Sequence, residues 1–163
     1  MIKKLFTAMF LAIFGTIACV AQTNDPQTVT NWGKSVCGVQ LSVALSNNIV
    51  AVGSAITVHC WIRNSSTNVV TTHSFGQPRY DFDVSLIDDS GKVYDLTPER
   101  SPQDIFFNTF IGIDPNKIYE SDILLQLDKQ IQPGNYELKV TRGILIQRKG
   151  YGLESNLLEV QIK

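Results

Sequence analysis

A segment near the middle of the chain alternates strictly between polar and apolar residues, and it constrains the fold more than any other feature. Apolar side chains stand at every second position, at Tyr80, Phe82, Val84 and Leu86. This period is typical of a β-strand with one buried and one solvated face. The turn signal Asp89-Ser90-Gly91 follows, because Gly tolerates positive φ and Asp can bond its own backbone. The sequence therefore predicts a β-hairpin over residues 80–96.

The rest of the chain consists of further short alternating segments separated by turn residues. Residues 39–45, 56–62 and 136–141 show the alternation most clearly, with a bend expected at Arg142-Gly143 and a turn at 149–152. We find no amphipathic helix after the N-terminal segment and no internal repeat. Many short strands with turns between them predict an all-β fold, an antiparallel immunoglobulin-like β-sandwich, over residues 37–163.

The N-terminal segment has the pattern of a secretion signal. Lys3-Lys4 precede an apolar run over residues 5–17, and Cys19-Val20-Ala21 provides small residues for cleavage after Ala21. We expect a signal peptide over residues 1–21, a flexible polar leader over 22–36, and a secreted or periplasmic product with no integral membrane segment after cleavage. Lipoprotein processing at Cys19 and a membrane anchor are the alternatives. Within the leader, Trp32 is expected to dock on the edge of the domain.

The charges of the chain are balanced, with 14 Lys and Arg against 15 Asp and Glu. Loss of Lys3 and Lys4 with the signal would leave 12 basic and 15 acidic residues. This balance does not favour nucleic acid as a partner. The sequence contains no phosphate-binding glycine loop and no zinc-type cysteine pair, so we expect no cofactor.

Residues that could support catalysis or metal binding are few. The chain contains two histidines, His59 and His73, and no Gly-x-Ser-x-Gly nucleophile elbow. We therefore expect a non-catalytic protein. A hydrolase that uses His59 or His73 is the alternative. Asp81 and Asp83 would share a strand face and could form a metal site with His73, but we expect no metal. Residues 88–91 are similar to part of a calcium loop but lack its spacing and its distal Glu, and the hairpin turn explains them.

An aromatic-rich segment breaks the alternation after the hairpin. Phe106, Phe107 and Phe110 lie within five residues, so they cannot all point inward from one extended strand. We hypothesise that they form part of a surface that binds a protein partner. The alternative is that they cap the core.

A disulfide between Cys37 and Cys60 is expected. Cys37 has the same parity as the apolar face of residues 39–45, and Cys60 has the parity of the apolar face of residues 56–62. Both thiols would then point into the core from neighbouring strands in an oxidising compartment. Two free buried thiols are the alternative.

The hairpin region resembles a known family. Ser74-Phe75-Gly76-Gln77, Tyr80-Asp81-Phe82 and Asp88 with Gly91-Lys92 resemble the Ser-Gly-Gln, Tyr-Asp-Phe and Asp-x-x-Gly-Lys pattern of BsuPI-type intracellular proteinase inhibitors. Residues 133–136 resemble the Pro-Gly-x-Tyr strand entry of that family. This chain departs from the family in two ways. It has Val93-Tyr94-Asp95-Leu96 where the family has a tryptophan-rich strand, and its N-terminus has the pattern of a secretion signal, whereas the family is intracellular. The resemblance implies a β-sandwich and a proteinase as partner, and it transfers no reactive residue.

These observations together predict a secreted or periplasmic non-catalytic binding module. Its partner would be a protein, with a proteinase as the partner that the resemblance implies. A structural or accessory protein of the cell envelope is the alternative.

Overall fold

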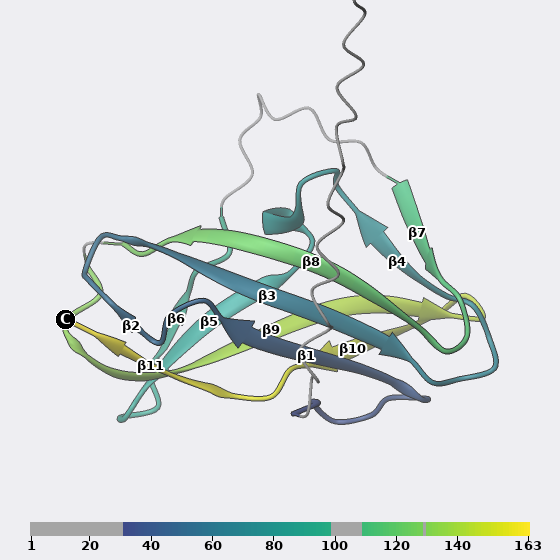
Figure 1. The fold of residues 1–163 in the computed structure, drawn as a ribbon, viewed down its shortest axis with the longest axis horizontal. Coiled ribbons are helices and arrows are strands. Elements are labelled where there is room, and N and C mark those ends of the chain that lie inside the picture. Colours follow the sequence, from purple (N-terminus) through teal and green to yellow (C-terminus); the bar gives the residue numbers. More distant parts are fainter. Residues whose placement is uncertain (1–30, 99–108, 129) are drawn as a thin grey trace, which may run out of the picture.

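The computed structural model describes residues 31–98, 109–128 and 130–163, and these form an immunoglobulin-like β-sandwich (Figure 1). The smaller sheet has the strand order β1-β3-β8 and crosses the larger one in Figure 1. Its strands are β1 (Val39–Leu45), β3 (Ala55–Asn64) and β8 (Lys117–Gln126). The predicted all-β fold class is confirmed.

The larger sheet has the order β2-β11-β9-β4-β7, with β10 and β5 also paired to β9, and β6 paired to β5. Its pairs are antiparallel except β2 with β11. Its strands are β2 (Ile49–Val50), β4 (Val70–Ser74), β5 (Asp83–Asp88), β6 (Val93–Asp95), β7 (Thr109–Ile113), β9 (Gly134–Ile146), β10 (Lys149–Glu154) and β11 (Leu158–Ile162).

The core lies between the sheets and consists of the apolar positions that alternation marks. In the smaller sheet they are Val39, Leu41, Val43, Ile56, Val58, Cys60 and Ile62, all buried. Val84 and Leu86 of β5 face them from the larger sheet, together with Leu138 and Val140 of β9. The period-two pattern therefore predicted the buried faces of these strands correctly.

The predicted hairpin is present as β5 and β6. Gly91 has a φ of +82° in its turn, and Asp88 accepts hydrogen bonds from the backbone and hydroxyl of Ser90. These bonds, with those from Lys92 and Tyr94, lower the pKa of the Asp88 carboxyl. The first strand of the hairpin, β5, begins at Asp83 and not at the expected residue 80, because Pro78–Tyr80 forms the 3-10 turn η1. Pro78 favours this start, since its φ is fixed and it has no amide hydrogen.

Strand β9 is the longest and connects most of the larger sheet. It continues through Arg142 and Gly143, so the bend expected there is absent. The chain turns instead at Gln147 and Arg148, whose φ values are +50° and +67°. Two such residues match the twist of a two-residue hairpin. The turn predicted at 149–152 is wrong, because these residues belong to β10.

The described part of the leader, residues 31–36, lies along β1. The Gly33 amide donates to the Leu41 carbonyl at 2.8 Å, and a Cβ at Gly33 would collide with the carbonyl oxygen of Glu154. The guanidinium of Arg63 lies 4.4 Å from the ring centre of Trp32. These contacts cover the free edge of β1.

Within the described residues, no helix is long and apolar enough to cross a membrane.

The structure does not contain the predicted disulfide, because Cys37 and Cys60 are both free. Cys37 lies in a tight turn with Gly38, both at positive φ, closed by hydrogen bonds between Val36 and Val39. It is therefore exposed and no longer follows the parity of β1. Cys60 lies opposite Val43, which is about 13 Å along the strand from the first residue of β1. A disulfide requires Cα atoms within about 7 Å.

We expect protein that begins at Gln22 to contain two reactive thiols when it is denatured without reductant. In the native protein we expect one reactive thiol, that of exposed Cys37, because Cys60 is buried and burial raises its pKa to about 12. Titration with a thiol reagent under both conditions measures these numbers, and Cys37→Ser is the control that should remove the native signal. No reactive thiol after denaturation would contradict the register described here.

Candidate functional site

Three aromatic side chains gather where β4 meets β7, and we call them the aromatic cluster: His73, Phe75 and Phe110. His73 lies directly opposite Phe110 in the strand pair. Its ring centre is 5.1 Å from that of Phe110 and 4.7 Å from that of Phe75, in edge-to-face arrangements. Phe110 is 63% exposed, while the other two are partly buried. The cluster therefore presents apolar surface on the outer face of the larger sheet.

The cluster includes one of the three phenylalanines predicted to bind a partner. Phe110 lies on the outer face and does not cap the core. Phe106 and Phe107 lie outside the described residues. The sequence did not indicate that His73 and Phe75 would join Phe110, because that depends on the register between β4 and β7.

A buried arginine lies behind the cluster. The side chain of Arg142 is 1% exposed, and its guanidinium carbon lies 4.2 Å from the ring centre of Phe82. Its Nε donates to the hydroxyl of Thr72 at 2.8 Å, and Nη2 donates to the carbonyl of His73 at 3.0 Å. The Thr72 hydroxyl in turn donates to the carbonyl of Gly143 at 2.9 Å. These bonds join β9 to β4 through side chains.

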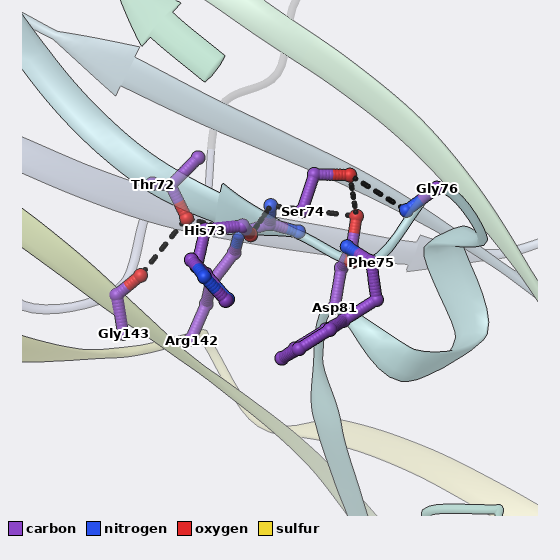
Figure 2. Close-up of polar contacts among 8 residues, drawn as sticks. All are labelled: Thr72, His73, Ser74, Phe75, Gly76, Asp81, Arg142 and Gly143. Carbon is purple, nitrogen blue, oxygen red and sulfur yellow. Dashed lines mark hydrogen bonds and ion pairs between the residues drawn. The ribbon is translucent and has the colours of Figure 1, made fainter. Parts of the chain in front are cut away.

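Asp81 provides the negative charge for this arginine. Its carboxylate is 2% exposed and lies 3.6 Å from Nη2 of Arg142. It accepts hydrogen bonds from the Phe75 amide at 2.7 Å and from the Ser74 hydroxyl at 2.9 Å. Figure 2 shows the carboxylate beside the segment that leads from β4 toward η1, with the Ser74 hydroxyl also accepting from the Gly76 amide.

The buried pair holds the backbone on which the cluster is built. The carbonyl of His73 and the amide of Phe75 are bound by Arg142 and Asp81, so both residues have fixed positions (Figure 2). Burial lowers the pKa of Arg142, and the charge of Asp81 opposes that shift. Among the described atoms Nη1 of Arg142 has no hydrogen-bond partner. The pair can support a rigid surface, and burial separates it from any substrate.

The structure does not bring together the residues that the hydrolase and metal-site hypotheses require. Nδ1 of His59 lies 2.7 Å from the Asp122 carboxylate on the outer face of the smaller sheet. In the described part of the chain, no serine hydroxyl bonds to either histidine. Asp81 is buried against Arg142, whereas Asp83 is exposed, so the two do not share a face as expected. The described residues contain no group of three potential metal ligands.

Sequence reasoning missed the Arg142 and Asp81 pair, although one signal was present. Arg142 has the same parity as Tyr136, Leu138 and Val140, which face the core. Continuing that alternation would have placed Arg142 inside and required a buried carboxylate near it. Asp81 carried no comparable signal, because it lies after η1 and not in a strand.

Comparison with known proteins supports the fold. No protein-family model matches the sequence, and no curated protein matches it. The crystal structure of Northeast Structural Genomics target SoR45 is similar with a TM-score of 0.51 and 11% identity, covering 79% of this chain and 90% of that one. At this identity the similarity concerns the fold alone.

Two further structures have lower scores. The putative ApaA protein of Bordetella pertussis has a TM-score of 0.46 and 9% identity, over 76% of this chain and 91% of that one. The sporulation control protein Spo0M of Bacillus subtilis has a TM-score of 0.47 and 10% identity, over 78% of this chain and 50% of that one.

We expect Arg142→Met to lower the free energy of unfolding by about 3–5 kcal/mol, because Asp81 would be buried without its cation. Denaturant unfolding measures this change. Arg148→Met, the same substitution in an exposed turn, is the control and should change it by less than about 0.5 kcal/mol. The double variant Arg142→Met/Asp81→Asn should recover part of the loss, since the unpaired charge is removed. A loss below about 1 kcal/mol for Arg142→Met would show that the pair does not stabilise the fold.

Proposed function

We propose that this protein is a non-catalytic binding module of the secreted or periplasmic space, and that it binds a protein partner through the aromatic cluster. The observation that carries the proposal is the exposure of Phe110, 63%, beside two rings that contact each other at fixed positions. Aromatic side chains with little freedom are the usual anchors of protein interfaces, because they bury a large area at low entropic cost.

The buried pair supports this proposal. A binding surface on a loop loses affinity when the loop has to be ordered on association. Here the His73 carbonyl and the Phe75 amide are already held by Arg142 and Asp81. The surface is therefore organised before a partner arrives. Phe106 and Phe107 are part of the proposal as well, since they precede Phe110 in the chain.

The partner that we propose is a proteinase, and its support is the resemblance of residues 74–92 to the BsuPI-type inhibitors. The segments that carry the resemblance include Phe75, which belongs to the aromatic cluster. They also include Asp81, whose carboxylate binds the Phe75 amide and so helps to position the cluster. Many proteinases have an apolar pocket for an aromatic side chain. Phe110 would enter such a pocket.

We expect Phe110→Ser to weaken binding of the proteinase by about 30-fold, the effect of losing an interface anchor of about 2 kcal/mol. Inhibition constants against serine, cysteine and metalloproteinases measure this, with chymotrypsin as the probe for an aromatic pocket. Leu124→Ser is the matched control, because Leu124 is similarly exposed, 65%, but lies on β8. The melting temperature of both variants should stay close to that of the unchanged protein.

If the panel shows no inhibition, the proteinase partner is excluded, and capture of envelope proteins on the immobilised protein tests the broader proposal. A captured protein whose binding is lost with Phe110→Ser and kept with Leu124→Ser would support it. Equal binding by both variants would exclude the aromatic cluster as the site.

A further inference from the structure

Strand β7 is an edge of the larger sheet that, within the described residues, lacks the usual protection. It stands at the end of the strand order, paired with β4 on one side, and no other described strand pairs with its second side. A free edge presents unpaired amides and carbonyls that can bind another strand. Proteins commonly protect such edges with charged residues, proline or bulges. None of the five residues of β7, Thr109–Ile113, is charged or proline.

The edges of the smaller sheet differ from β7 in this respect. The edge of β1 is covered by the leader, through the hydrogen bond from Gly33 to Leu41. The edge strand β8 carries Lys117, Glu120 and Asp122 at exposed positions. Pairing of two β8 strands about Ser121 would place Glu120 opposite Asp122, and two like charges repel. Among the described strands, β7 therefore has neither the covering segment seen on β1 nor the exposed charges seen on β8.

The side chains of β7 are complementary to a second copy of the same strand. An antiparallel pair centred on Ile111 would place Phe110 of one copy opposite Gly112 of the other, on the outer face. Gly112 has no side chain, and the Phe110 ring is free to lie across it. The two Phe110 rings would be diagonal neighbours at about 7–8 Å, within reach of aromatic side chains. On the inner face, Ile111 would meet itself and Thr109 would meet Ile113.

We propose that two copies of this chain pair through β7, antiparallel and centred on Ile111, so that the larger sheet continues from one copy into the other. Main-chain hydrogen bonds provide the affinity of such an added strand, and the side-chain fit sets its register. The pairing would also join the aromatic clusters of both copies into one continuous surface. This inference concerns the edge of β7 and does not depend on the proposed partner.

Disulfide cross-linking tests the register. In the Cys37→Ser background, Ile111→Cys should form a covalent dimer under mild oxidation, because directly opposed Cα atoms lie about 4.5–5.5 Å apart and a disulfide accepts about 4.4–6.8 Å. Thr109→Cys is the matched control, since its two copies would be offset by about 13 Å along the strands. Equal cross-linking of both variants, or none with Ile111→Cys, would overturn the proposal.

Sedimentation equilibrium tests the pairing without cysteines, and it decides the matter if Ile111→Cys does not fold. The unchanged protein should double its mass as its concentration rises, and Gly112→Lys should stay monomeric because it places a charge on the edge opposite Phe110. A Cβ at Gly112 would meet only Val69 at 3.6 Å, so the variant is tolerated in the monomer. Gly152→Lys, on β10 with open space around it, is the control and should still dimerise.

The same variants separate this inference from the proposed function. Gly112→Lys should remove the dimer and leave the cluster of each monomer able to bind its partner. Phe110→Ser should weaken both. A monomeric unchanged protein at all concentrations would overturn the pairing and leave the partner proposal unaffected.

Discussion

The ion pair between Arg142 and Asp81 determines the structure at one end of this sandwich. A charge of this kind can be buried only where an opposite charge and enough hydrogen-bond partners surround it. Thr72 and His73 supply acceptors, and Phe75 and Ser74 supply donors for the carboxylate. Two of these contacts bind the backbone directly, at the His73 carbonyl and the Phe75 amide, and the other two bind the hydroxyls of Thr72 and Ser74. The exposed aromatic surface is thus placed by polar chemistry in the interior.

The exposed ring of Phe110 lies outside the apolar core. The apolar core lies between the sheets and contains Val84, Leu86, Leu138 and Val140. Phe110 contributes little to it, being largely exposed. The apolar core and the exposed ring of Phe110 therefore lie on opposite faces of the larger sheet, and the pair of Arg142 and Asp81 connects the interior to the aromatic cluster.

Alternation along the chain predicted much of the fold, because the side chains of a strand point to its two faces in turn. It predicted the buried faces of β1, β3 and β5, and the hairpin at Gly91. It failed where the backbone leaves the extended region. Cys37 has a φ of +51° in a turn that Gly38 marks, but the parity argument treated Cys37 as part of the strand. Arg148 has a φ of +67°, and its turn with Gln147 contains no Gly, Asn or Asp to mark it. The aromatic cluster also could not be predicted, since it depends on the pairing of strands far apart in sequence.

The position of Cys60 has a consequence for the order of events during folding. In the native register it faces Val43, six residues from Cys37, so a bridge formed in the unfolded chain would hold β1 out of register. Sandwiches of this type fold in about milliseconds to seconds, whereas disulfides form in about seconds to hours. Once the sheets close, a thiol with a pKa of about 12 is almost never ionised at neutral pH. Folding that is faster than disulfide formation would therefore leave both thiols free in the native protein.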